Sequence, residues 1–356
     1  MKHDGESMTT TTESLMRSEA RSAPERVATL FAQSGPAIAA LAQELVSAHA
    51  HTAITVARGS SDHAAGHMAY LLMSRMGLLT MSLPPSVVTL HHAPLRARGT
   101  AALAFSQSGQ SPDLIETVTA LGARGAFTAA FVNDTASPLA AASKHVVDLC
   151  VGPEKSVAAT KSFIAQLAAG LRLLAHWSAD HALLAALKDL PNVLAEAVDA
   201  DWSSAVEPLL RAERLFVVGR GAGLSVAAEM ALKFKEVCGI QAEAFSAAEI
   251  KHGPMALVNA GYPVLVLAPR GTEQAGLLAV ADDLRARGAT ILVASTQPNA
   301  QLPIATTRAA ATTSSHELFD ALCAVQSFYL MVERLARARD LDPDHPPHLN
   351  KVTRTT

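Results

Sequence analysis

Short apolar runs alternate along the chain with longer segments of helical periodicity. The apolar runs, which we predict to be strands, lie at 52–57, 101–105, 126–132, 146–151, 215–218, 264–268 and 290–293. The periodic segments, which we predict to be helices, include those that end near residue 75 and those at 112–123, 225–238 and 316–337. Short strands separated by helices are typical of parallel sheets covered on both faces. The pattern therefore predicts the α/β class, with two tandem doubly wound parallel-sheet domains of the flavodoxin-like three-layer α/β/α type.

A comparison of the chain with itself indicates two copies of one unit. A shift of 162 residues places the Arg-Gly pair at 58–59 on the same pair at 220–221. A shift of 163 places Ala-Arg-Gly at 123–125 on 286–288. Several matches in the same order favour a duplication over chance.

The same pattern suggests how the chain is divided. An ordered helix is expected from Pro24 onward, and the helical stretch 156–210 should be interrupted at Pro191. The expected segments are a disordered N-terminus at 1–20, a first domain at 21–180, a helical linker at 181–205, a second domain at 206–340 and an irregular, proline-rich C-terminal tail at 341–356.

Composition narrows the class of partner and the compartment. The 356 residues carry a formal net charge of -3, and 49% of them are hydrophobic. Without a basic surface we expect no binding to nucleic acid or to a membrane, and charged residues interrupt every long apolar run. The N-terminus has no apolar signal segment, and the three cysteines are scattered along the chain. We therefore expect a cytoplasmic protein.

Hydroxyl groups gather in two loops of the first half. Ser60 and Ser61 follow the first predicted strand, and the run SQSGQS follows the next one. The carboxyl ends of neighbouring parallel strands meet at one edge of a sheet, where ligands of open α/β folds bind. Serine hydroxyls, backbone N–H groups and helix N-termini at that edge would hold a phosphate.

These serines could serve either local backbone structure or anion binding. A single serine more often caps a helix or closes a turn, and Ser111 is the expected N-cap of helix 112–123. Two adjacent hydroxyl-rich loops together favour an anion site. The equivalent positions of the second half carry Ala222, Gly223, Ala268 and Arg270. The copies have therefore diverged, and we expect one composite site for each pair of domains.

The most concentrated acid–base chemistry lies between residues 233 and 254, in KFKEVCGIQAEAFSAAEIKHGP. Lys233 and Glu236 are three residues apart and share a helix face, and His252 stands at a Gly-Pro bend. An amine, a carboxylate and an imidazole can open a sugar ring and move a proton next to a carbonyl. A simpler interpretation also fits, in which Glu229 and Lys233 form an i,i+4 pair and Glu236 is solvated.

A further polar cluster opens the helix after the last strand of the first half. Glu154, Lys155 and Ser156, followed by Thr160 and Lys161, suit contact with a substrate hydroxyl, and equally an N-cap with solvated charges. The histidines lack metal-ligand spacing with any cysteine or acidic residue. The glycine turns match neither a Walker loop nor a complete GxGxxG. We therefore expect no metal and no cofactor.

Together these motifs resemble the sugar isomerase (SIS) family, and in particular the two-domain isomerase half of the glutamine–fructose-6-phosphate aminotransferases. The resemblance covers about residues 20–356. It rests on SQSGQS, on EKSVAATKSF, on GRG with the ALKFKE…AEAFSAAEIKHGP block, and on the terminal HLNKV. It implies two tandem SIS domains.

The resemblance also implies a role for each matching residue. Glu236 would move a proton between C1 and C2 of the sugar with help from Lys233, and His252 would open the pyranose ring. Lys351 matches the family's Schiff-base lysine. In the family the ring-opening histidine comes from the neighbouring subunit, which implies a homodimer acting on a small-molecule sugar phosphate. The implied substrate-binding residues are Ser60, Ser61, Ser106, Gln107, Ser108, Ser111, Val157 and Ala158.

One departure from the aminotransferases shapes the expected function. Their glutaminase domain uses an N-terminal cysteine, whereas the first cysteine here is Cys150, so we expect that domain to be missing. The remaining chemistry resembles that of type II glucosamine-6-phosphate deaminases, which implies conversion of glucosamine 6-phosphate to fructose 6-phosphate and ammonia. The alternatives are glucosamine-6-phosphate synthesis with ammonia or a separate glutaminase, a sugar-amine 6-phosphate deglycase, and a sugar-phosphate sensor. The complete catalytic set argues against the sensor.

Overall fold

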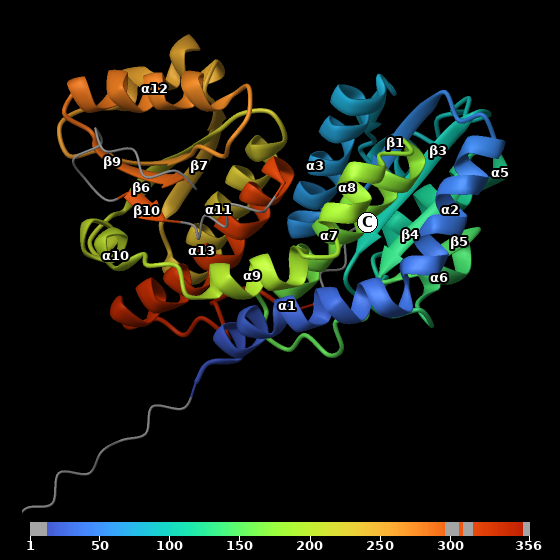
Figure 1. The fold of residues 1–356 in the computed structure, drawn as a ribbon, viewed down its shortest axis with the longest axis horizontal. Coiled ribbons are helices and arrows are strands. Elements are labelled where there is room, and N and C mark those ends of the chain that lie inside the picture. Colours follow the sequence, from blue (N-terminus) through green and yellow to red (C-terminus); the bar gives the residue numbers. More distant parts are fainter. Residues whose placement is uncertain (1–12, 296–305, 309–315, 352–356) are drawn as a thin grey trace, which may run out of the picture.

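Two α/β domains, joined by long central helices, form the structure (Figure 1), a computed structural model that describes residues 13–295, 306–308 and 316–351. The first sheet has the strand order β2-β1-β3-β4-β5 and the second the order β7-β6-β8-β9-β10 when read from the opposite edge, and all pairs are parallel. The strands are β1 (Thr52–Val56), β2 (Thr80–Ser82), β3 (Thr100–Ser106), β4 (Phe127–Val132), β5 (His145–Asp148), β6 (Arg214–Gly219), β7 (Gln241–Ser246), β8 (Pro263–Leu267), β9 (Thr290–Ser295) and β10 (Thr306–Arg308). The predicted fold class is confirmed.

The helices repeat in the same order in the two domains. A shift of 162 residues places α3 on α11 and α5 on α12, so the duplication seen in the sequence is also a structural one. The helices are α1 (Leu15–Gln33), α2 (Gly35–Ser47), α3 (Gly59–Met76), α4 (Ser86–Thr89), α5 (Pro112–Ala123), α6 (Pro138–Ala142), α7 (Lys161–Trp177), α8 (His181–Ala186), α9 (Leu190–Val198), α10 (Ser203–Leu209), α11 (Ala222–Cys238), α12 (Gln274–Ala286) and α13 (Asp320–Ala338), with 3₁₀ turns η1 (Glu249–His252), η2 (Pro254–Leu257) and η3 (Glu317–Phe319).

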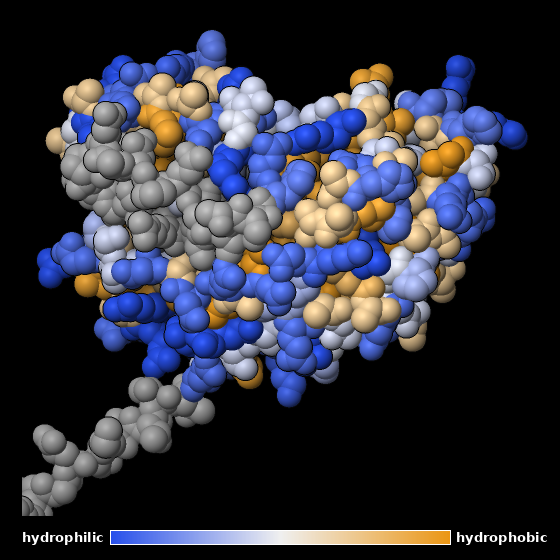
Figure 2. All heavy atoms as spheres, in the orientation of Figure 1, coloured by the Kyte–Doolittle hydropathy of each residue, from blue (hydrophilic) through white to orange (hydrophobic). Residues whose placement is uncertain are grey.

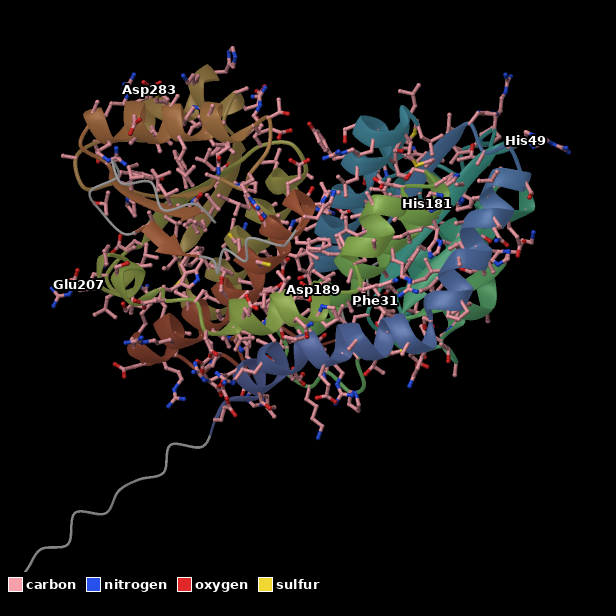
Figure 3. The ribbon with its side chains drawn as sticks, viewed as in Figure 1. Phe31, His49, His181, Asp189, Glu207 and Asp283 are labelled. Carbon is pink, nitrogen blue, oxygen red and sulfur yellow. The ribbon has the colours of Figure 1, made fainter. Side chains whose placement is uncertain are left out.

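The core is continuous between the domains. α7 and α13 are buried along nearly their whole length, including polar residues such as Gln166 of α7 and Gln326 of α13. Phe163 of α7 meets Tyr329 of α13 edge to face, with 6.5 Å between ring centroids. In Figure 3, side chains fill the space between the central helices and the sheets. Burying these two helices therefore holds the domains together, and it sets the position of α11 beside them.

The N-terminal expectation is wrong from residue 15 onward. α1 begins at Leu15, with Ser14 Oγ accepting from Arg17 N at 3.2 Å as its N-cap. Pro24 lies inside α1 and does not start it. Residues 1–12 and 352–356, which the predicted disordered N-terminus and the tail include, lie outside the described residues. The described part of the tail, 341–351, has neither helix nor strand.

Three strands were not predicted, and one was placed too far along the chain. β2, β7 and β10 lie at the edges of their sheets. β5 ends at Asp148, because Cys150 adopts a φ of 55° that no strand can continue.

Hydrophilic residues cover most of the face drawn in Figure 2. Within the described ranges, no helix has both the length and the apolar character needed to cross a membrane.

Candidate active site

Lys233 lies at the centre of the candidate site, fully buried on α11. Its Nζ donates to Ser60 Oγ at 3.0 Å and to a carboxylate oxygen of Glu236, and it lies 3.3 Å from Glu229 Oε1. Burial alone would lower the pKa of Lys233, but the carboxylates of Glu229 and Glu236 outweigh it and hold the pKa above its usual value. Lys233 is therefore a fixed positive charge between two carboxylates.

The sequence of α11 explains why these groups lie together. An apolar stripe of Val226, Met230, Phe234 and Val237 is buried and anchors the helix in the core. Glu229, Lys233 and Glu236, spaced by four and three residues, share the face beside that stripe. Since Lys233 reaches Ser60, this face is turned toward the N-terminal end of α3.

Glu229 is a site residue that sequence reasoning treats only as a partner for Lys233. It is fully buried, His63 Nδ1 lies 3.0 Å from its Oε2, and the Tyr329 hydroxyl donates to its Oε1 at 3.0 Å. Burial raises the pKa of Glu229, but Lys233 and His63 outweigh burial and bring it below the usual value. The spacing along α11 could have identified Glu229, whereas Tyr329 comes from α13 and has no local sequence signal.

The serine cradle (Ser60, Ser61, Ser106, Ser108 and Ser111) occupies the carboxyl edge of the first sheet. Ser60 and Ser61 lie in the first turn of α3, Ser106 ends β3, and Ser111 is the N-cap of α5. Because β1 and β3 are paired neighbours, the two loops lie next to each other. The sequence prediction of a shared edge is therefore met by the topology.

Some cradle hydroxyls also shape their own loop. Ser106 Oγ accepts from Gly109 N at 3.0 Å, and Ser108 Oγ accepts from Gln110 N at 3.3 Å. A hydroxyl that accepts one hydrogen bond still has a proton to donate, so loop closure and anion binding are compatible. The Ser111 side chain makes no cap hydrogen bond.

Two further contacts hold the cradle in place. Arg58, next to Ser60, donates through Nε to Asp113 of α5 at 2.9 Å and thereby joins the two loops. Gln166 of α7 donates to Ser61 Oγ at 3.0 Å. The arginine is committed to Asp113, so the cradle relies on hydroxyls, backbone N–H groups and the N-termini of α3 and α5.

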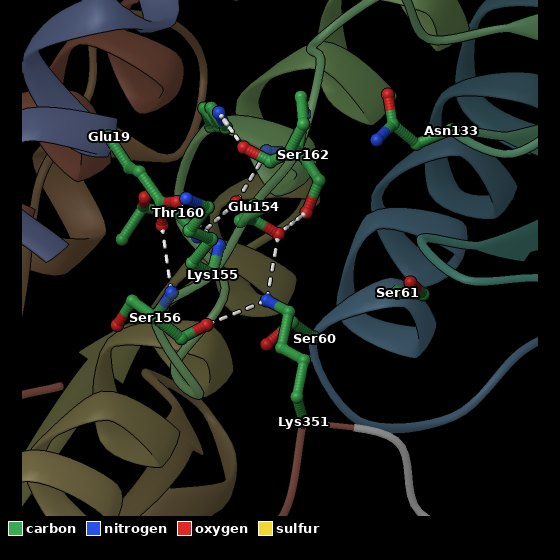
Figure 4. Close-up of polar contacts among 12 residues, drawn as sticks. Glu19, Ser60, Ser61, Asn133, Glu154, Lys155, Ser156, Thr160, Ser162 and Lys351 are labelled. Atoms are coloured by element: carbon green, nitrogen blue, oxygen red, sulfur yellow. Dashed lines mark hydrogen bonds and ion pairs between the residues drawn. The ribbon is translucent and has the colours of Figure 1, made fainter. Parts of the chain in front are cut away.

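Lys351 is held on the loop between β5 and α7 (Figure 4). Its Nζ donates to Glu154 Oε2 at 3.2 Å and to Ser156 O at 2.8 Å. Glu154 is buried and also accepts from Ser162 Oγ at 2.6 Å and from the Thr160 and Ser162 N–H groups at 3.1 Å. Burial raises the pKa of Glu154, but Lys351 and Ser162 outweigh it and lower the pKa. Solvated charges, one interpretation of this cluster, are therefore excluded for Glu154, which itself caps α7.

Segments distant in the sequence stabilise the same loop. Glu19 of α1 accepts from Lys155 N at 2.5 Å and from Ser156 N at 3.2 Å. Val157 N donates to Asp344 O of the tail at 3.3 Å, and Ala158 is buried. The tail is thus attached to the loop at Val157 and, through Lys351, at Ser156.

His252 lies apart from the charged residues of α11. It is exposed at the end of η1 and contacts none of the α11 charges in this chain. The neighbouring Lys251 donates to Asp283 of α12 at 3.0 Å, and Figure 3 labels Asp283 on the outer side of the second domain. A single chain therefore gathers Lys233, Glu236 and the cradle, and it leaves His252 facing solvent.

The chain resembles known proteins in both sequence and fold. The sequence profile of the SIS domain matches residues 47–176 and 208–336. A glutamine–fructose-6-phosphate aminotransferase (isomerizing) of Pyrobaculum aerophilum is 34% identical over 339 residues, which are 92% of this chain and 55% of that protein. The chain spans about half the length of the curated relatives it matches.

Solved structures show the same fold over more than nine tenths of the chain. A Silicibacter pomeroyi protein, to which a phosphosugar isomerase activity is ascribed, is 41% identical, with a TM-score of 0.86 over 93% of this chain and 100% of its own. A glucosamine-6-phosphate deaminase of Thermotoga maritima has a TM-score of 0.74 over 96% of this chain and 100% of its own. At 21% identity that second likeness concerns the fold alone.

Proposed function

Because the chain belongs to the SIS domain family, we propose that it is a phosphosugar isomerase that deaminates an amino-sugar phosphate, namely glucosamine 6-phosphate. The observation that supports this proposal is the bridge that Lys233 makes between Ser60 and Glu236. It joins a cradle suited to a phosphate with a carboxylate suited to proton transfer. The names of the Pyrobaculum and Silicibacter proteins point to the same class of substrate.

The proposed reaction consumes one water and releases one ammonia. After ring opening, Glu236 takes the proton from C2 of the open-chain aldehyde while O1 takes up a proton, which gives an enolamine. Glu236 then returns its proton to C1 and the amine loses one N–H proton, which balances the proton gained at O1 and produces the imine of fructose 6-phosphate. Water adds to the imine carbon, the C–N bond breaks, and ammonia leaves with fructose 6-phosphate as the other product.

Each remaining residue has a defined task in this proposal. Lys233 orients the Glu236 carboxylate and supplies positive charge where the enolamine oxygen gains electron density. His252 of a second subunit opens the ring, as expected for an imidazole near neutral pH. Lys351 can form a Schiff base with the ketose only after its amine leaves Glu154 and loses a proton.

Product analysis tests the proposal. The purified chain is incubated with glucosamine 6-phosphate, and ammonia and fructose 6-phosphate are quantified by a coupled assay and by mass spectrometry. We expect both products in equal amounts. If no amino-sugar 6-phosphate yields ammonia, the deaminase proposal is abandoned.

The synthetic direction is the second candidate, and the aminotransferase relatives are the observation that favours it. The same site would add ammonia to fructose 6-phosphate and move the proton back from C1 to C2. Initial rates in both directions at one ammonium concentration decide between the two. A rate measurable only from fructose 6-phosphate would replace deamination with synthesis.

We also propose a homodimer in which His252 acts across the interface, which the exposure of this residue allows and which can be tested by mixing subunits. Glu236→Gln and His252→Ala chains are each expected to be inactive. After unfolding and refolding as an equal mixture, half the dimers are mixed and each has one intact site, so about a quarter of wild-type activity should return. If His252 acts within its own chain, no activity returns.

A further inference from the structure

A second pocket lies at the carboxyl edge of the second sheet, apart from the candidate active site. Its volume is about 340 Å³, within the range of small-molecule sites. It is lined by the loops after β6 and β8, including Arg220, Gly223 and Thr272, and by His67 and Tyr70 of α3. In Figure 1, α3 lies on the side of the first domain that faces the second.

The second pocket is the duplicate of the candidate active site. The shift of 162 residues places Glu229 on His67, Lys233 on Leu71 and Glu236 on Ser74, and all three counterparts line the pocket. The cradle position Ser108 corresponds in the same way to Arg270 of the pocket wall. The second pocket therefore lacks counterparts of the Glu229, Lys233 and Glu236 side chains.

The groups that remain suit a small phosphorylated ligand. Arg220 forms no ion pair with any described residue, and it directly precedes Gly221, the N-cap of α11, against which the Glu273 carboxylate lies. His67 is 2% exposed, lines the pocket and has no hydrogen-bond partner among the residues that the structure describes. Glu273, which accepts from the Tyr70 hydroxyl at 3.4 Å, offers an acceptor for sugar hydroxyls.

We propose that the second pocket binds a phosphorylated sugar without transforming it and that its occupancy regulates the candidate active site. The phosphate lies by Arg220 and His67, and the polyol extends toward Glu273, whose carboxylate lies against Gly221 at the N-terminus of α11. The binding part of this proposal is independent of the proposed function. The regulatory part rests on it.

Two helices connect the sites. α3 carries Ser60 at its first turn and His67 in its middle, and α11 carries Gly223 at its start and Lys233 near its end. They therefore run in opposite directions, each with one end at each site. They pack closely where they cross, since a Cβ on Gly66 would lie 2.9 Å from Ser225 Oγ. A ligand that shifts α3 against α11 changes the Ser60–Lys233 contact.

Calorimetry with glucitol 6-phosphate tests the binding. This probe has a phosphate and hydroxyls but no carbonyl, so the enzyme cannot isomerise it, and glucitol is the neutral control. We expect two sites per chain for the phosphorylated probe. Ser111→Asp keeps a good N-cap but repels phosphate, so it should remove one site, and Arg220→Gln should weaken the other at least tenfold. Arg287→Gln, an exposed arginine of the same domain, is the matched control.

The outcomes separate the two proposals. One site in the wild type, lost in Ser111→Asp and unchanged in Arg220→Gln, overturns the second pocket and leaves the function standing. One site lost only in Arg220→Gln supports the second pocket and contradicts the cradle. With two sites present, glucosamine 6-phosphate turnover is measured with and without the probe in the Arg220→Gln and Arg287→Gln chains. An equal response in both chains overturns the regulatory part.

Discussion

α3 and α11 occupy equivalent places in the two domains, but they bury different chemistry. α11 buries Glu229 and Lys233 in a cluster whose charges compensate one another. α3 buries His67, the counterpart of Glu229, and burial lowers the pKa of His67 to about 4, so the ring is neutral near pH 7. A buried charge is stable only when it is paired and hydrogen-bonded. One position of the scaffold thus holds either a compensated ion cluster or a neutral ring, and only the cluster contacts the proposed base Glu236.

Removing the base from α11 should have the largest effect. Glu236→Gln keeps the shape and a hydrogen bond to Lys233 but cannot accept a proton, so we expect turnover of glucosamine 6-phosphate to fall by about 10²–10⁴-fold. The side chain is partly exposed, so the fold should persist. Glu243→Gln, an exposed glutamate on β7, is the control and should keep full turnover. Normal activity in Glu236→Gln would show that α11 does not carry the catalytic base.

Matched leucine substitutions test the buried groups directly. Glu229→Leu leaves Lys233 short of one carboxylate in the core, and breaking a buried pair costs about 3–5 kcal/mol. His67→Leu removes a ring without a hydrogen-bond partner among the described residues, and the unfolding free energy at pH 7 should change by less than about 1 kcal/mol. Urea unfolding followed by circular dichroism measures both. Equal losses of unfolding free energy in the two variants would mean that Glu229 of α11 and His67 of α3 do not differ in their contribution to stability.

Lowering the pH should reveal the same difference between α3 and α11, with a smaller change in the unfolding free energy. His67 has a pKa of about 4 in the folded chain against an ordinary value of 6.5. Between these values the unfolded chain binds more protons, so stability falls as the pH is lowered through this window, by up to about 3 kcal/mol. His67→Leu lacks this contribution and should gain stability relative to the wild type as the pH falls from 7 to 4. Parallel stability curves would show that His67 does not titrate as described.

The regular part of the fold could be predicted because its pattern is local. α5 has the predicted bounds, and the central strands β3 and β8 lie within one or two residues of their predicted positions. Edge strands gave no such signal. β2 and β7 have one neighbour each and are largely exposed or half-buried, so they lack the continuous apolar run that marks a central strand.

The candidate site also has a part that could be predicted from the sequence and a part that could not. Lys233 and Glu236 could be paired from their spacing on one helix. His63 and Tyr329, which complete the setting of Glu229, come from 166 and 100 residues away. The start of α1 depends on Asp344, which accepts from Leu15 N and Met16 N at 2.7 Å each. Contacts of this kind are created by tertiary packing, so no local pattern predicts them.

Breaking an ion pair on the surface should have the smallest effect on stability, in contrast to breaking the buried pair of Glu229 and Lys233. Lys251 and Asp283 are about half exposed, and such pairs contribute about 0–1 kcal/mol. Asp283→Asn should leave the urea midpoint almost unchanged. Asp282→Asn, which breaks the pair with Arg285 within α12 and leaves the contact with η1 intact, serves as its control. Because Lys251 precedes His252, turnover of the Asp283→Asn chain is measured as well and should stay within about twofold of wild type. A much larger loss of turnover at unchanged stability would mean that α12 positions η1, and that placing His252 depends on the second domain's surface as well as on the subunit interface.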